Sequence, residues 1–317
     1  MDVLQEHLVW AHASGGVFAR SAAIPPWGLR LGGTIQLAVH AVVQGHAWLW
    51  TEQGDEPLRL TPGDLALVRG GPDHFIASEP GAQCVSHEEF RSLPADDEGR
   101  IGAHGAVFLC GAYRFAGDIG AGLIEALPPV LSIPSSIDDP IHGVVTLLSR
   151  EMAHPGPGQQ TVLDRLLDVL VVLGLRTGLA RSPTAPAWFR AACDPRLSPA
   201  LEAIHANPGQ PWTVDDLARL SHMSRATFAR VFQQALRQAP MKYLADWRMA
   251  LARDLLLDQG TTLAEIGGQV GYSSEYAFAT AFRRHHGQSP GRWRRQAAPF
   301  RVRQFQEPAA QRPNVTA

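Results

Sequence analysis

The first third of the chain alternates short apolar runs with turn-forming residues. Between residues 30 and 120 the runs are Leu37–Val43, Ala47–Trp50, Leu65–Val68 and Val107–Cys110, separated by Gly, Pro and Asp. Runs of this length that are rich in β-branched and aromatic residues are typical of strands. Pro62–Asp64 is a turn signal, because proline presets φ and glycine tolerates a positive φ. This pattern predicts an all-β barrel or sandwich.

The hydrophobic period lengthens between residues 138 and 181, where apolar residues recur three and four positions apart. This spacing predicts two amphipathic helices, separated by a Pro- and Gly-rich break at His154–Gly158. The apolar positions are Ile141, Val144, Val145 and Leu148, then Val162, Leu163, Leu166, Leu167, Leu170 and Leu173. Val169, Val171 and Val172 widen the second stripe, so this helix is expected to be buried on two sides. Its second side would contact either the β-rich part or another copy of the chain.

Residues 213–295 contain one helix-turn-helix pattern twice. The matching residues stand about 50 positions apart: Phe228 with Phe278, Phe232 with Phe282, Gln238 with Gln288 and Pro240 with Pro290. Thr213 and Thr262 are instead 49 apart, and one extra residue in the second turn explains the difference. A repeat this close indicates two copies of one supersecondary unit in a single domain.

Each copy also carries signals for where its helices begin. Capping boxes, in which a hydroxyl and a carboxylate cap each other's backbone amides, are predicted at Thr213 with Asp216 and at Thr262 with Glu265. Ser224 and Ser274 stand where the second helix of each pair begins, and serine is a favoured N-cap. The phenylalanines of each second helix are four residues apart and would face the core. The opposite face of that helix is then free to enter a groove.

Charge differs between the two parts of the 317-residue chain, although the formal net charge is only -2. Residues 1–196 hold 13 Lys and Arg against 21 Asp and Glu, a net charge of -8. Residues 197–317 hold 15 Lys and Arg against 9 Asp and Glu, a net charge of +6. A positive surface beside a repeated helix-turn-helix suits a phosphate backbone, which would repel the acidic part.

Composition indicates a globular cytoplasmic protein of two domains. The chain is too long for one ordinary core, and 45% of its residues are hydrophobic and 18% charged. No apolar run is long enough to span a bilayer, since even Leu166–Leu175 includes Asp168. Met1–Glu6 lacks the basic start of a secretory signal. The three cysteines are too few and too scattered for a disulfide framework, which favours a reducing compartment.

Residues 197–296 resemble the AraC/XylS-type DNA-binding domain. The resemblance is carried by Thr213–Ala218, Ser224–Phe232, Ala264–Ile266, Val270–Tyr272, Phe278–Phe282 and Gly287–Pro290. In that family a central helix joins two helix-turn-helix motifs, and Met241–Leu257 fits this helix. The resemblance implies that one chain places two recognition helices in major-groove segments one turn, about 34 Å, apart.

By position, the resemblance implies two sets of base-reading residues. The first recognition helix would present Arg225, Ala226, Thr227, Ala229 and Arg230, and the second Glu275, Tyr276, Ala277 and Thr280. Arg230 is the strongest candidate, because a guanidinium can make two hydrogen bonds to guanine. Ala226 and Ala229 offer methyl contacts only, whereas Glu275 would accept a hydrogen bond from cytosine. Thr280 stands where the family often has arginine, so the second helix is expected to position more than it reads.

Further residues of the basic part are expected to contact DNA phosphates. These are Ser224, Ser274, Arg283, Arg284, Arg292, Arg294 and Arg295. Such contacts give affinity without sequence information. Arg225, at the start of its helix, is an equal candidate for a phosphate contact. Arg237 aligns with Gly287, where a helix end favours positive φ, and a non-glycine residue there costs about 1 kcal/mol.

The β-rich part resembles the cupin-type sensor domain that precedes the DNA-binding part of many AraC-like regulators. The resemblance is carried by His40 with Val42–Gly45, Pro62–Asp64 with His74, Cys110–Tyr113 and Leu127–Val130. It implies a cupin-like β-barrel with an effector pocket, for which His40, Trp48, His74 and Cys110 are candidates. The histidines fit equally as hydrogen-bonded residues of the barrel wall. Cys110 fits either an inert buried side chain or a thiol sensor.

Metal-dependent catalysis is the competing function for the β-rich part. Enzymatic cupins hold a metal with two histidines and a glutamate from one motif and a histidine from a second. His74 aligns with the second-motif histidine, but Val42 stands where a ligand should follow His40, and no glutamate follows at the expected distance. One or two imidazoles bind a metal weakly. We therefore expect no metal, no cofactor and no enzymatic activity.

The sequence thus predicts a one-component transcription factor of mixed α and β fold. The expected parts are a cupin-like effector-sensing domain at 1–135, a helical connector and linker with a dimer interface at 136–196, an all-α domain with two helix-turn-helix motifs at 197–296, and a flexible tail at 297–317. Its expected partners are double-stranded DNA, a small-molecule effector or oxidant, the transcription machinery and a second copy of the chain. Two alternatives remain: a metal-dependent cupin enzyme fused to a DNA-binding domain, and an architectural DNA-binding protein whose first domain only dimerises.

Overall fold

The computed structural model describes residues 3–10, 14–33, 35–53, 56–92, 105–115, 117–154, 156–258 and 260–296. The predicted tail at 297–317 lies outside the described residues. The chain divides into two compact units: residues 7–116 with 120–190, here called the sheet unit, and residues 1–6, 117–119 and 191–317, here called the helical unit. The domain borders predicted at 135/136 and 196/197 stay predictions.

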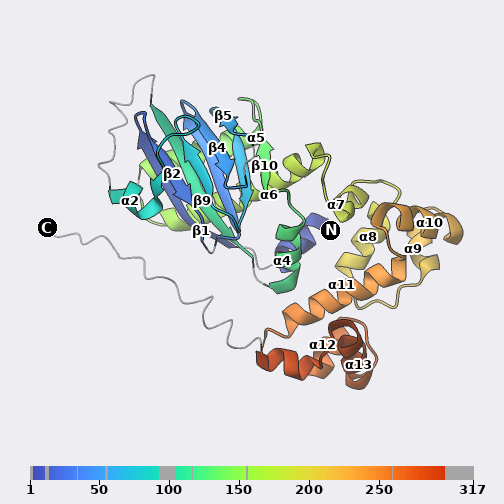
Figure 1. Ribbon diagram of the computed structural model, residues 1–317. Coiled ribbons are helices and arrows are strands. Elements are labelled where there is room, and N and C mark those ends of the chain that lie inside the picture. The colour runs from blue at the N-terminus through green and yellow to red at the C-terminus, as the bar shows by residue number, and fades with distance from the viewer. Residues whose placement is uncertain are drawn as a thin grey trace. The chain divides into compact units, whose positions relative to one another are not determined.

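The described strands of the sheet unit form two five-stranded sheets (Figure 1). Sheet A has the order β1 (Ser14–Ala23), β9 (Ala106–Arg114), β3 (Leu37–Gln44), β6 (Leu65–Arg69) and β10 (Val130–Ile133). Sheet B has the order β5 (Leu58–Leu60), β4 (Ala47–Thr51), β7 (His74–Ala77), β2 (Gly28–Leu31) and β8 (Val85–Ser86). Neighbouring strands are antiparallel, except β2 and β8, which are parallel.

The predicted order of a β domain, a helical connector and an all-α domain is confirmed, but the two sheets are not closed into a barrel. Closure needs continuous hydrogen bonding around the strands. In the described part of the chain, β1 and β10 form the edges of sheet A, and β5 and β8 form those of sheet B. The strands therefore form a sandwich, the second arrangement that the strand pattern allows.

The core of the sandwich follows the alternation of side chains along each strand. Leu49 is fully buried in it, whereas Trp48 and Trp50, its neighbours in β4, are half-buried. Leu29 and Ile76 of sheet B and Phe108 of sheet A belong to the same cluster. Because successive side chains point to opposite faces, each strand of sheet B has an inner and an outer row.

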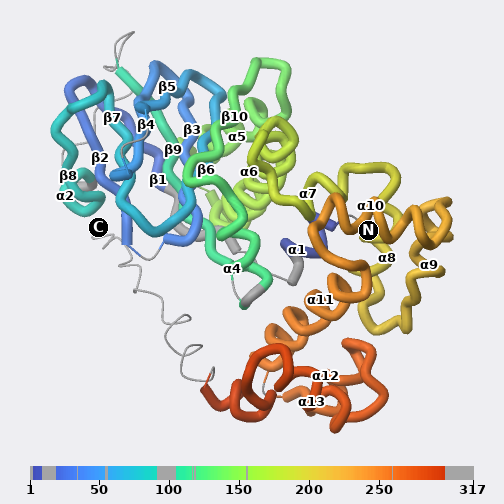
Figure 2. Tube along the Cα trace, turned by 45° about the vertical axis from the view of Figure 1, so that its right-hand side comes forward, coloured from blue at the N-terminus to red at the C-terminus, as the bar shows by residue number. Residues whose placement is uncertain are grey.

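Helices α5 (Pro140–Ala153) and α6 (Gln159–Arg181) pack together and against sheet A, as Figures 1 and 2 show. They cover its second face, so β3 is buried on both sides. Gly174 allows the close approach of α6, because a Cβ there would lie 2.7 Å from the Leu65 side chain. The two predicted amphipathic helices are confirmed.

The other helices that the structure describes before residue 197 are short. They are α1 (Val3–Trp10), α2 (His87–Ser92), α4 (Gly117–Glu125) and α7 (Ala187–Ala192). Among the helices that the structure describes, none combines the length and apolar character needed to cross a membrane.

The helical unit contains both helix-turn-helix motifs. Its helices are α8 (Ser198–Ala206), α9 (Val214–Leu220), α10 (Arg225–Leu236), α11 (Pro240–Leu255), α12 (Leu263–Gln269) and α13 (Glu275–His286). Helices α9 and α10 form the first motif and α12 and α13 the second, with α11 between them (Figure 1). The predicted central helix is therefore present, ending two residues earlier than expected.

The two motifs repeat each other in detail. Both capping boxes are formed, with Thr213 and Thr262 each accepting from the amide three residues on. The turns match as well: the amide of Met223 donates to the carbonyl of Ala218, and the amide of Tyr272 to that of Gly267. The four phenylalanines of α10 and α13 are fully buried. The repeat predicted from the sequence is confirmed as two copies of one structural unit.

Candidate functional site

Helix α10 presents one polar face to solvent. Arg225, Ala226, Thr227 and Arg230 are exposed and Ala229 is half-buried. Arg225 pairs with Asp215 of α9, with 3.2 Å between guanidinium nitrogen and carboxylate oxygen. Arg230 has only a long contact, 3.5 Å, to the amide oxygen of Gln234. Its guanidinium is therefore available to an outside partner, whereas that of Arg225 is partly neutralised.

Helix α13 presents a different set of side chains at the same positions. Glu275, Tyr276 and Thr280 are exposed, and Ala277 is half-buried. Tyr276 occupies the position of Ala226 in the first copy, and Thr280 that of Arg230. The second recognition helix thus replaces the long cation of the first with an aromatic ring and a threonine.

Two exposed residues of α10 were not predicted as candidates. Gln233 and Gln234 follow Arg230 at helical spacing and lie at the positions of Arg283 and Arg284 in the second copy. The offset between the copies is the signal that would have found them. The ends of the two recognition helices therefore differ in charge, with amides in the first and guanidinium groups in the second.

The predicted phosphate contacts have unequal surroundings. Arg283, Arg284, Arg292 and Arg295 are exposed. Arg294 is half-buried, and its Nη2 donates to the carbonyl of Thr261 at 2.7 Å. The Ser224 and Ser274 hydroxyls accept from the amides of Thr227 and Ala277 and so cap their helices. Arg294 therefore braces the turn before α12, and the two serines have a structural task besides any DNA contact.

Inside the sandwich, three of the predicted effector residues form one hydrogen-bonded chain. His40 Nε2 lies 2.9 Å from His74 Nε2, and His40 Nδ1 lies 3.1 Å from Cys110 Sγ. His40 and Cys110 come from adjacent strands of sheet A and His74 from sheet B, so the chain joins the two sheets. All three side chains are buried.

Burial determines the protonation of this chain. It lowers the pKa of His40 well below the ordinary range, and the nearby His74 lowers it further. It lowers the pKa of His74 to about 4, partly offset by Asp73. It raises the pKa of the Cys110 thiol to about 12. At neutral pH the chain therefore holds two neutral imidazoles and a thiol, and one proton must lie between the two Nε2 atoms.

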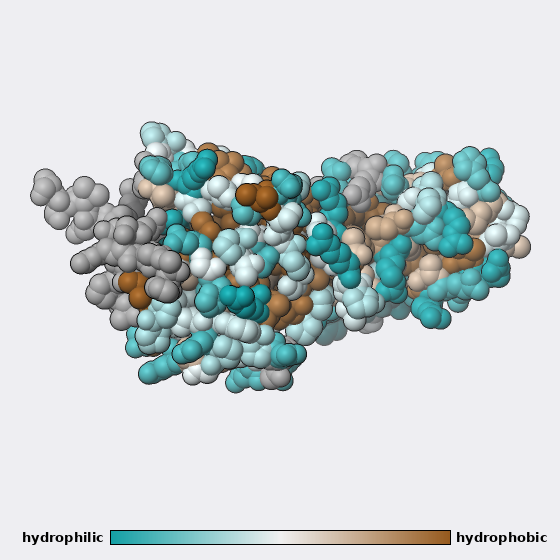
Figure 3. Space-filling model, turned by 90° about the horizontal axis from the view of Figure 1, so that it is seen from above, coloured by the Kyte–Doolittle hydropathy of each residue, from teal (hydrophilic) through white to brown (hydrophobic). Residues whose placement is uncertain are grey.

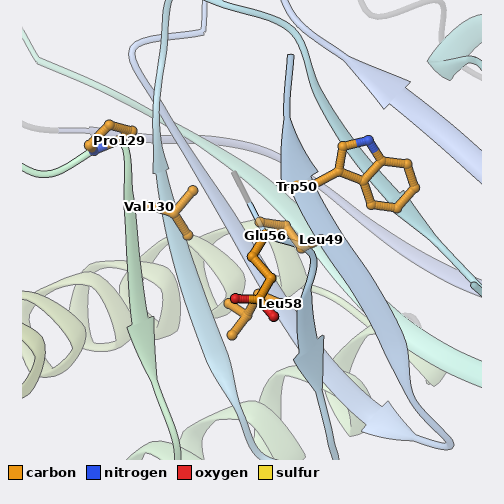
Figure 4. A pocket seen from close by; sticks show the side chains of 6 residues that line it. All are labelled: Leu49, Trp50, Glu56, Leu58, Pro129 and Val130. Atoms are coloured by element: carbon orange, nitrogen blue, oxygen red, sulfur yellow. The ribbon is translucent and has the colours of Figure 1, made fainter. Parts of the chain in front are cut away.

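Trp48 does not join the other three residues. It shares a face of β4 with Trp50, opposite to the buried Leu49, and this face points away from the inner row of the sandwich. A separate hollow of about 150 Å³ lies where β5 and β10 approach (Figure 4), lined by Leu49, Trp50, Glu56, Leu58, Pro129 and Val130. None of the four predicted effector residues lines this hollow.

Comparison with known proteins agrees with both parts of the chain. A family model described as Cupin matches residues 2–180, and one described as Helix-turn-helix domain matches residues 217–296. The chain is 30% identical over 299 residues to a Streptomyces lividans protein described as an AraC-like transcription regulator, covering 93% of this chain and 98% of that one. It is 29% identical to the HTH-type transcriptional regulator AlkR of Acinetobacter baylyi, and the match covers 94% of this chain and 100% of AlkR. The solved DNA-binding domain of AdpA, in complex with a target DNA, is 32% identical, covers 36% of this chain and 99% of its own, and gives a TM-score of 0.32.

A cupin domain joined to a double helix-turn-helix defines a class of transcriptional regulators that bind double-stranded DNA. The chain belongs to the AraC-type transcriptional regulators. Its similar proteins are named as regulators, not as enzymes.

The metal of enzymatic cupins does not fit the donors present. His40 uses both ring nitrogens, one toward His74 and one toward Cys110, so the three side chains surround no common point. Among the described residues, no group of three or more His, Cys, Asp or Glu side chains is arranged to hold a metal ion. The described donors therefore do not form the metal site of an enzymatic cupin.

Proposed function

We propose that the cupin domain senses an effector, a small molecule or an oxidant, and changes how the helix-turn-helix domain engages DNA and the transcription machinery. The supporting observation is the buried chain of His40, His74 and Cys110. Polar groups inside an apolar core are costly unless they bond to one another, and this chain joins both sheets. A ligand that changes these bonds would change how the sheets pack. The proposal includes no catalytic step, and it places the protein in the cytoplasm beside its DNA.

In this proposal both recognition helices contact base edges, and arginines near the end of the second helix contact phosphates. Residues Arg225, Ala226, Thr227, Ala229, Arg230, Glu275, Tyr276, Ala277 and Thr280 would meet base edges. The exposed arginines at and beyond the end of α13 would follow the phosphates. Arg230 would carry most of the discrimination, because it is exposed and its guanidinium has only one long contact.

The proposed dimer uses the outer face of α6. The surface drawn in Figure 3 is mainly hydrophilic, with apolar residues scattered through it. On α6, however, Val162, Val169 and Val172 are between 36% and 45% exposed, although the opposite face of the helix is fully buried. Exposed apolar side chains that share one helix face mark an interaction surface. A second copy of the chain would bury this face.

Effector sensing is tested by measuring DNA affinity against a panel of small molecules and oxidants. We expect at least one of them to change the affinity of the full chain about five-fold or more. His74→Gln should remove this response, because it breaks the bond between His74 and His40, while the variant still binds DNA through the helical unit. DNA binding that no compound alters would instead support an architectural protein.

A further inference from the structure

Tyr276 is the most exposed large apolar or aromatic side chain in the described residues, with 82% of its surface accessible. Such exposure is unusual for an aromatic ring, which normally buries most of its area. Within the described part of the chain the ring takes part in no hydrogen bond and no ring contact. Tyr272 instead packs against Phe278, with 6.0 Å between ring centroids. The fold therefore does not depend on the Tyr276 ring.

Tyr276 stands where a recognition helix meets DNA bases. It is the second residue of α13, and residues in the first turns of such a helix contact base edges. Thr280 lies four residues on and is also exposed, so the two side chains share one face. Phe278 and Phe282 hold the opposite face in the core. The ring and the threonine methyl group thus form one small apolar surface on the reading side.

The chemistry of this surface differs from that of the first copy. Ala226 and Arg230 occupy the same two positions in α10. An arginine there reads guanine, whereas a ring with a methyl group has no charge to offer. The apolar group that the major groove presents is the C5-methyl of thymine. Glu275, also exposed, would accept a hydrogen bond from a cytosine amine.

We propose that Tyr276, with Thr280 beside it, is a specificity-determining residue that recognises a thymine methyl group in the segment contacted by the second recognition helix. The proposal rests on the proposed DNA-reading role of both helices. It differs from the sequence-based expectation that the second helix mainly positions the protein. The first helix would then read guanine and the second thymine, which makes the binding site asymmetric.

The test begins with DNA sites selected by the full chain from a random pool. In the segment bound by the second copy, each thymine is replaced by uracil, which lacks only the C5-methyl, and affinity is measured by fluorescence anisotropy. We expect one replacement to weaken binding about four-fold, the effect of one buried methyl group. Tyr276→Ala should weaken binding to the thymine site by a similar factor and show no further loss with uracil. Tyr276→Phe should behave like the original protein.

Three outcomes would overturn the inference. Equal uracil effects in the original protein and Tyr276→Ala would show that another residue meets the methyl group. A loss in Tyr276→Phe as large as in Tyr276→Ala would assign the contact to the phenol oxygen. If no uracil has any effect while selected sites are still bound, thymine is not read, although the DNA-binding function stands. A chain that selects no sequence at all would overturn the proposed function itself.

Discussion

Arg237 has a left-handed backbone conformation, with φ of 59°, at the end of α10. Gly287 occupies the same place at the end of α13, with φ of 74°. This confirms the positive φ inferred from aligning the two copies. A side chain costs about 1 kcal/mol in this region, because its Cβ crowds the backbone.

The two positions provide a matched pair of substitutions. Arg237→Gly should raise the free energy of unfolding of the helical unit by about 0.5 to 1 kcal/mol, and Gly287→Arg should lower it by a similar amount. Urea denaturation followed by circular dichroism measures both. Changes of the same sign in the two variants would disprove the shared backbone requirement.

Arg230 and Arg284 separate base reading from phosphate binding. Arg230→Ala should reduce discrimination at one base pair by about 1 to 3 kcal/mol, whereas Arg284→Ala should weaken all sequences alike. Arg284 is a better comparison than Arg294, because Arg294 already donates to the carbonyl of Thr261. Affinities for a set of sites with single base changes give the result. Identical profiles for the two variants would contradict the assigned roles.

At the scale of the element, α6 has an exposed apolar face formed by Val162, Val169 and Val172. Val169→Glu should convert a dimer into a monomer, because a carboxylate cannot be buried without a partner. Gln160→Glu, at an exposed polar position on the opposite side of the same helix, should leave the proposed dimer intact. Light scattering coupled to size-exclusion chromatography measures the mass of each variant. An unchanged mass for Val169→Glu would remove α6 from the interface.

The elements were predictable where the signal is local. Capping boxes and phenylalanines four residues apart fixed both helix-turn-helix motifs, because those contacts lie within a few residues of one another. Closure of the sheets was not predictable, since alternation says which side chains face inward but not which edge strands pair.

In the cupin domain, too, contacts between residues far apart in the sequence could not be predicted. His40 and His74 are 34 residues apart and meet only because two sheets face each other. Trp48 does not lie with them, and the local pattern already indicates this. In Ala47–Trp50 the tryptophans alternate with Leu49, which places both on the face opposite to the core.

At the scale of the whole molecule, the buried histidines predict how stability depends on pH. The pKa of His74 in the folded chain is about 4, below the ordinary 6.5. Between these two values the unfolded chain binds a proton at His74 and the folded chain does not. The stability is fully present above about pH 6.5 and falls as the pH drops toward 4, by about 3 kcal/mol at most. His74→Gln should flatten this dependence in urea titrations at pH 7.5, 6 and 5. An equally steep slope in this variant would assign the effect to other groups.

The central claim is that one chain reads DNA with two unlike recognition helices. Selection of bound duplexes from a random pool by the full chain tests it most directly. We expect one enriched motif in two parts, separated by one helical turn of about 10 base pairs, with guanine prominent in one part and thymine in the other. Enrichment of a single short segment, of two identical segments or of no sequence would contradict the claim.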